Sequence, residues 1–148
     1  TDDINQLCEI VQAHPSIKVL ELVGCRGQYI NGCKMLQSIM TAGASKLKKV
    51  AMMSNSISMG GNMFLSNFLA TNPVLVTLEL SDNNLNDNDA YCIASALKHN
   101  TNLRLLDLEN NGLTHRGWDA LRKAEFDTTS LNSAADSNHT CLIINPNY

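Results

Sequence analysis

The chain of 148 residues is long enough to form one domain with a sizeable hydrophobic core. Apolar residues make up 44% and charged residues 17% of it, a composition that argues against intrinsic disorder. The formal net charge of −3 argues against a nucleic-acid partner, and no apolar run approaches the roughly 18 residues of a membrane span. The first residue is Thr1 rather than Met, so we expect a processed or incomplete chain, in which any targeting segment would be missing.

Five cysteines, an odd number without a C-x-x-C pair, favour buried reduced thiols over a disulfide framework or a zinc site. Reduced thiols are typical of a reducing compartment, so we expect an intracellular and cytoplasmic protein. The five residues are Cys8, Cys25, Cys33, Cys92 and Cys141.

The chain opens with a segment that has the apolar spacing of a helix. Its apolar residues follow the i, i+3, i+4, i+7 pattern, which places them on one helical face. They are Ile4, Leu7, Cys8 and Val11. Residues 1–16 are therefore predicted to be the leading helix of a partial repeat.

A segment that repeats at a fixed period begins at residue 17. The clearest copies, residues 75–85 and 103–113, both read L-x-x-L-x-L-x-x-N-x-L at an offset of 28 residues (103 − 75), which predicts a solenoid. The apolar alternation that opens each copy predicts a β-strand with one buried face. The repeats start at Ile17, Leu47, Leu75, Leu103 and Leu131.

Position eight of each repeat holds a side chain that can satisfy backbone groups where the chain leaves the strand. In the first four repeats this residue is Cys25, Asn55, Asn83 or Asn111. Cys25 thus has a structural explanation before any redox one.

The second half of each repeat has the apolar spacing of a helix. In the third repeat the stripe consists of Ala90, Ile93, Ala94 and Leu97. The fourth repeat keeps Trp118 and Leu121, but Arg122 and Glu125 stand where apolar residues are expected. Asp87 or Asp89, and Thr114, are candidates to cap the starts of the third and fourth helices.

The last repeat fails after its first residues. Leu131 and Ala134 fit a strand, but Asp136 stands at an inward position and no helix is predicted to follow. We expect the tail from His139 to Tyr148 to cover the edge of this final strand. The chain is thus predicted to be a single domain (1–148) with a leading helix (1–16), four repeats (17–130) and a degenerate C-terminal cap (131–148).

The 28-residue period with a full helix in each repeat resembles the ribonuclease-inhibitor class of leucine-rich repeats. The resemblance implies an α/β right-handed solenoid, a horseshoe arc with parallel strands on the concave face and helices on the convex face. Proteins of this class are similar in gripping other proteins through the concave sheet and its edge loops. They include inhibitors of ribonucleases, activators of small GTPases, actin-regulating caps and pattern sensors. The resemblance therefore implies a non-catalytic protein-binding module.

Strand positions two, four, six and seven of each repeat are expected to face the concave side. Acidic residues in these positions form a stripe interrupted by one lysine, with scattered apolar side chains such as Val19 within it. This mixture is typical of a protein-binding surface and would attract a basic partner, although a solvated face that binds nothing is the open alternative. The predicted partner-binding residues are Glu21, Lys49, Met53, Glu79, Asp82, Leu105, Asp107 and Glu109. The last strand would add Ser133, Ala135 and Ser137.

Catalytic, metal and cofactor sites are not predicted. Asp107 and Glu109 are paired carboxylates, but they are expected on an open sheet without an apolar pocket to shift their pKa values. The histidines fall on different repeats at no recognisable metal spacing. They are His14, His99, His115 and His139.

Two other functions remain open. Arg116 is expected in an edge loop, where it could be presented to a nucleotide hydrolase, so the chain could regulate a small GTPase. It could also be a structural subunit of a larger assembly, docking through the convex side near Tyr91 or through its open end. Asn138-His139-Thr140 is a glycosylation acceptor sequence, although reduced cysteines argue against its use.

Overall fold

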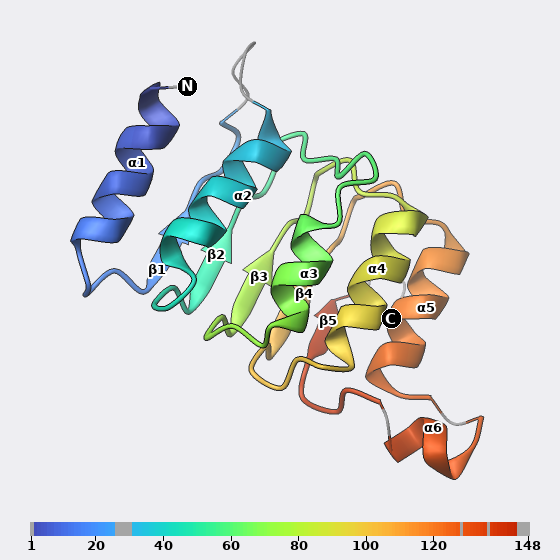
Figure 1. Cartoon of the computed structure of the whole chain (residues 1–148). Coiled ribbons are helices and arrows are strands. Elements are labelled where there is room, and N and C mark those ends of the chain that lie inside the picture. The colour runs from blue at the N-terminus through green and yellow to red at the C-terminus, as the bar shows by residue number, and fades with distance from the viewer. Residues whose placement is uncertain (1, 26–30, 128, 136, 145–148) are drawn as a thin grey trace.

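The computed structural model describes residues 2–25, 31–127, 129–135 and 137–144. Its strands form one parallel sheet in which sequence neighbours are also spatial neighbours. Helices α1 to α5 lie side by side in chain order on one face of this sheet (Figure 1), so the predicted α/β solenoid is confirmed. The elements are α1 (Asp2–Ala13), β1 (Val19–Glu21), α2 (Gly32–Gly43), β2 (Lys49–Ala51), α3 (Phe64–Ala70), β3 (Thr77–Glu79), α4 (Asp87–Leu97), β4 (Leu105–Asp107), α5 (His115–Glu125), α6 (Leu131–Ala135) and β5 (Leu142–Ile144).

Strand pairing keeps equivalent repeat positions side by side. Val19 pairs with Lys49, Lys49 with Thr77, and Thr77 with Leu105, so the register advances by the 30, 28 and 28 residues of the repeat. The middle residue of each strand points toward the helices and is buried in β2 to β5. These residues are Leu20, Val50, Leu78, Leu106 and Ile143.

The helical stripes predicted from the sequence supply the other half of the core. Leu36 of α2, Leu69 of α3 and Leu97 of α4 are fully buried, and Val11 anchors α1 against the same core. Each such leucine contributes about 2 kcal/mol to the free energy of folding through removal of apolar surface from water. The leading helix is therefore part of the stack.

Asparagines at position eight link consecutive repeats, as the repeat predicts. The Asn83 amide accepts hydrogen bonds from the backbone N–H groups of Asn55 and Ile57, and it donates to the carbonyls of Met52, Leu80 and Ser81. Asn55 and Asn111 make corresponding bonds one repeat away on either side. Because these groups are buried, the amides replace water for the turning backbone.

The caps of the third and fourth helices differ partly from the prediction. Asn86, not Asp87 or Asp89, is the N-cap of α4, and Asp89 completes a capping box by accepting from the Asn86 N–H. Thr114 caps α5 as predicted. The sequence favoured the aspartates because it shows which residues can cap, but the backbone turn decides which one does.

Asp87 instead connects two repeats. Its carboxylate accepts hydrogen bonds from the Thr114 N–H at 2.8 Å and the Thr114 hydroxyl at 2.6 Å. These bonds lower the pKa of Asp87 below 3.8. The close approach of α4 and α5 also requires Gly117, where a Cβ atom would lie 2.5 Å from the Asp87 Oδ1 atom.

The fifth strand is not where the sequence placed it. Residues 131–135, predicted to begin that strand, form the short helix α6, and β5 pairs with β4 only from Leu142 onward. The register thus advances by 37 residues from Leu105 (142 − 105), nine more than the 28-residue period. The predicted inward position of Asp136 lies outside the described residues.

Asn138 explains why the strand resumes after α6. Its side chain donates to the carbonyls of Leu97 and Asn100 at 2.7 and 2.5 Å, and it accepts from the backbone N–H groups of Thr140 and Cys141. Asn100 makes similar bonds at the preceding repeat, to the Leu69 carbonyl and from the Leu103 N–H. One asparagine therefore restores the repeat geometry after the insertion.

Candidate functional site

Two rows of side chains cross the sheet face opposite the helices, which is the concave face of the prediction. Since strand residues alternate between faces, the first and third residue of each strand share this side. The first row consists of Val19, Lys49, Thr77, Leu105 and Leu142. The second row consists of Glu21, Ala51, Glu79, Asp107 and Ile144.

Lys49 neutralises much of the predicted acidic stripe. Its Nζ atom lies 2.7 Å from Glu21 Oε1 and 3.0 Å from Glu79 Oε1, so one lysine bridges carboxylates from the strands on either side. The hydrogen bonds that the Lys49 ammonium donates to Glu21 and Glu79 raise the pKa of Lys49, because they stabilise its charged form. Lys49, which interrupts the acidic stripe in the sequence, therefore forms the centre of an ion-pair cluster with Glu21 and Glu79.

The remaining acidic residues of the predicted site lie toward β4. Asp107 Oδ1 accepts a hydrogen bond from the Glu109 N–H at 3.0 Å, and the Asp82 N–H donates to the Glu109 carbonyl at 3.0 Å. Asp82 is exposed, with a positive φ of 56°. Beyond the Lys49 centre, negative charge is thus concentrated in Asp82, Asp107 and Glu109 at the carboxyl ends of β3 and β4.

Apolar side chains are most exposed at the two ends of the concave face. Val19 and Val23 at one end are 54% and 58% exposed, and Leu142 at the other is 59% exposed. Met53 and Leu105, both predicted contacts, are partly buried between them. The concave face therefore has an ionic centre between two apolar ends.

Several concave-face predictions need correction. Ala51 and Ser81 occupy concave positions but are 0% and 6% exposed, so larger neighbours cover them. Ala135 belongs to α6 and Ser137 follows it, so neither extends the sheet face. Leu142 and Ile144 take that place. The sequence missed them because the nine-residue insertion moved the strand out of the repeat frame.

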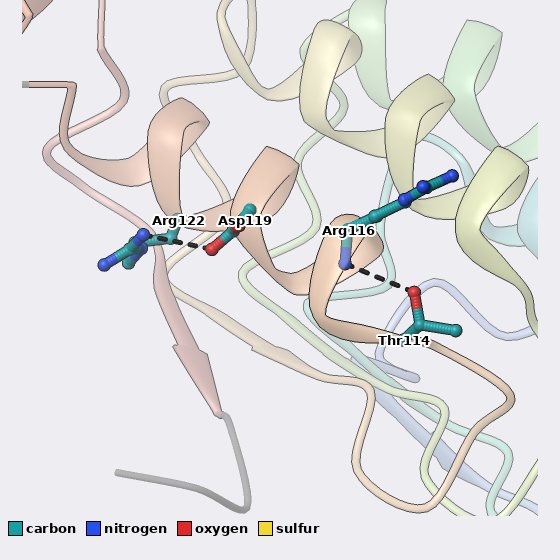
Figure 2. A network of polar contacts seen from close by, with 4 residues as sticks. All are labelled: Thr114, Arg116, Asp119 and Arg122. Carbon is teal, nitrogen blue, oxygen red and sulfur yellow. Dashed lines mark hydrogen bonds and ion pairs between the residues drawn. The ribbon is translucent and has the colours of Figure 1, made fainter.

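Arg116 is not in an edge loop as predicted. It is the second residue of α5, where its backbone N–H donates to the capping Thr114 hydroxyl at 3.2 Å. Figure 2 shows its side chain extending away from Asp119 and Arg122. The Arg116 guanidinium therefore projects from a helix, and it has less reach than it would have from a loop.

The glycosylation sequence at Asn138 is inaccessible in this structure. Asn138 is 7% exposed, and its Nδ2 atom, to which a glycan would be joined, already donates two backbone hydrogen bonds. The Thr140 hydroxyl donates to Asn138 Oδ1 at 2.7 Å. The motif therefore serves the fold rather than a glycan.

Buried thiols have pKa values that disfavour reactivity. Burial, with a smaller contribution from the Glu125 carboxylate, raises the pKa of Cys141 to about 12. Burial also raises the pKa of Cys33. Within the described residues, no three His, Cys, Asp or Glu side chains gather as a metal site would require. No helix in the described part of the chain is both long and apolar enough to cross a bilayer.

A family model described as a leucine-rich repeat matches residues 71–94 and 99–121. The mouse protein named NACHT, LRR and PYD domains-containing protein 14 is 32% identical over 114 residues, which cover 76% of this chain and 11% of that protein. The chain thus spans about a tenth of the length of this relative.

Solved structures share the fold. Actin-binding site 2 of leiomodin-1 superposes with a TM-score of 0.75 at 16% identity, covering 95% of this chain and 76% of that one. The C-terminal domain of tropomodulin from Caenorhabditis elegans superposes with a TM-score of 0.50 at 14% identity, covering 81% and 92%. At these identities the likeness concerns the fold alone.

Proposed function

Because this chain is a leucine-rich-repeat protein, we propose that it binds another protein through the concave face and acts without catalysis. The observation that carries the proposal is the exposure of apolar side chains on that face. Three of the seven large apolar residues that are exposed in the described chain, Val19, Val23 and Leu142, lie there. Apolar anchors around a charged centre are characteristic of protein interfaces.

The distribution of charge supports a partner with a basic surface. Glu21 and Glu79 are compensated by Lys49, whereas Asp82, Asp107 and Glu109 leave the β3–β4 end negative. A partner that placed lysines or arginines over this end would gain mainly in association rate, since exposed charges are screened by salt. We place the basic contact there rather than along the whole stripe.

The proposal extends to the organisation of the chain. We propose that residues 1–148 work as one domain of the ribonuclease-inhibitor class, in which the 28-residue repeats and their full helices supply a rigid platform. The actin-binding role named for the leiomodin structure makes actin one candidate to test, because both chains present a similar parallel sheet.

A paired set of variants tests the concave face. Val19→Ser with Asp107→Lys removes one apolar anchor and reverses one charge, while Ile10→Ser with Glu9→Lys makes the same changes on α1. The matched apolar residues are 54% and 51% exposed. Each chain is used to enrich binding proteins from a cell extract. We expect the wild-type chain and the α1 variant to enrich the same proteins, and the concave-face variant to lose them. Equal retention by both variants, with unchanged thermal unfolding, would contradict concave-face binding.

Regulation of a small GTPase is less well supported, because the arginine that suggested it lies in α5 rather than in a loop. Arg116 is nevertheless exposed and forms no ion pair with any described residue. If this alternative held, Arg116→Ala would lower GTP hydrolysis by a partner GTPase while leaving its binding intact. No change in hydrolysis would remove the alternative.

A further inference from the structure

A cavity of about 520 Å³ lies at the C-terminal end of the stack, between α5 and the last described strand. Its walls are mostly apolar, with three charged residues among them. It is lined by Glu109, Trp118, Leu121, Arg122, Glu125, Leu142, Ile143 and Ile144. A volume of this size lies in the range of small-ligand sites.

The repeat frame shows that charged residues stand here in place of core residues. Glu125 and Arg122 occupy the stripe positions that Leu97 and Ala94 fill one repeat earlier, and those two are 0% and 7% exposed. A regular continuation of the stripe would have closed this space with apolar side chains. Charged residues at core positions of a repeat point to a role other than packing.

The charge balance in the cavity is negative. Arg122 lines the cavity, but its guanidinium already has a carboxylate partner, since its Nη2 atom lies 3.0 Å from Asp119 Oδ1. Figure 2 draws this ion pair. Neither Glu109 nor Glu125 has an ion-pair partner in the described chain. The Glu125 carboxylate also acts on its surroundings, since it contributes to raising the pKa of Cys141.

Trp118 gives the cavity an aromatic wall. It lies on the apolar stripe predicted for α5, but it is only partly buried where it packs against the core. An indole face beside carboxylates is the chemistry that receives a guanidinium, which stacks on aromatic rings and pairs with carboxylates. Leu142 and Ile144 can cover the aliphatic part of the same side chain.

We propose that this cavity receives an arginine side chain from the protein that binds the concave face. The proposal rests on the proposed function, because Leu142 and Ile144 belong both to the cavity and to the concave face. It adds that the partner carries an arginine where it crosses β5. Glu109 and Glu125 pair with the guanidinium, and Trp118 covers its plane.

Trp118 is the sole tryptophan of the chain, so its fluorescence reports on this cavity alone. The full chain is titrated with the peptide acetyl-Gly-Gly-Arg-Gly-Gly-amide and with the same peptide carrying citrulline, a neutral isostere of arginine. We expect the arginine peptide to change the Trp118 emission and to bind about tenfold or more tightly than the citrulline peptide, because a charged hydrogen bond is lost. Glu109→Gln with Glu125→Gln should remove the response, whereas Glu9→Gln on α1 should preserve it.

Other results would overturn the proposal. Equal binding of both peptides would show an apolar cleft without charge recognition, and no response to either would show that the cavity takes no arginine. A response only in a chain ending at Ile144 would assign the cavity to residues 145–148. A Trp118 signal that depends on protein concentration alone would assign it to a second copy. Any of these results would leave the test with the Val19 and Asp107 variant unaffected, so the two proposals fail separately.

Discussion

The middle repeats and the C-terminal end solve the same structural problem in different ways. Between β2 and β4 each step takes 28 residues, and buried asparagines such as Asn83 join one repeat to the next. Between β4 and β5 the step takes 37 residues, includes α6, and depends on Asn138. The 28-residue period can therefore be interrupted without loss of the sheet, provided that an asparagine side chain still hydrogen-bonds the backbone where two repeats meet.

The largest effect should come from breaking the middle of the stack. Asn83→Ala leaves three carbonyls and two N–H groups without their side-chain partner, and most of them are buried. We expect a loss of about 4 kcal/mol in the free energy of unfolding, measured by urea denaturation. The adjacent Asn84 is exposed, so Asn84→Ala should cost less than about 0.5 kcal/mol. Similar costs for the two variants would show that Asn83 does not link the repeats.

A smaller and more local effect is expected at the C-terminal end. Asn138→Ala removes bonds to the Leu97 and Asn100 carbonyls, but these bonds position only the last strand, which pairs with β4 alone among the described strands. We expect a loss of about 2 kcal/mol, with faster amide hydrogen exchange confined to residues 137–144. Asn132→Ala in α6, where the side chain is exposed, is the matched control. Faster exchange across the whole chain would instead show that the end and the middle unfold together.

The helix side of the middle repeats has a pH-dependent link. The folded pKa of Asp87 lies below 3.8 because Thr114 donates to its carboxylate, so this bond stabilises the fold above that pH and is lost as the pH falls through the folded pKa. Asp87→Asn should therefore lower the melting temperature at about pH 7 and have less effect at about pH 3. A difference from wild type that is the same at both pH values would show that the ionised carboxylate is not responsible.

The smallest effect should occur at the N-terminal end. Cys25 holds position eight of the first repeat, where no earlier strand presents carbonyls for an amide to reach within the described residues. Cys25→Asn should consequently change stability by less than about 0.5 kcal/mol, measured by thermal unfolding. If Cys25→Asn instead increased the free energy of unfolding by about as much as Asn83→Ala decreases it, position eight would contribute equally in every repeat.

The repeat pattern was sufficient to predict the regular part of the molecule. It located β1 to β4, the helical stripes and the Thr114 cap, because each depends on residues close in sequence. It also located the asparagine links, because the fixed period puts an asparagine at the same position of successive repeats. It failed for the fifth strand, since the insertion keeps an apolar Leu131 at the expected start while the pairing resumes at Leu142. The β-branched Ile143 and Ile144 favour a strand at the second segment, but the repeat frame pointed to the first, because it carries no information on the length of an insertion.

The candidate site was also predicted only in part. The sequence placed Glu21, Glu79, Asp107 and Lys49 on one face, and pairing of the strands puts them there. It could not determine that Lys49 would bridge two carboxylates, because those residues lie 28 to 30 positions away and meet only across strands. The cavity beside Trp118 was also hidden, although Arg122 and Glu125 marked its location as breaks in the apolar stripe.

The sequence by itself determined a periodic stack with one buried row per strand, since apolar spacing acts over a few residues and the fixed period repeats it along the chain. The tertiary structure decided where the stack ends, which charges compensate one another and where a cavity remains open. These depend on groups brought together from different repeats, and their balance of Coulomb attraction, desolvation and packing exists only once the sheet has formed.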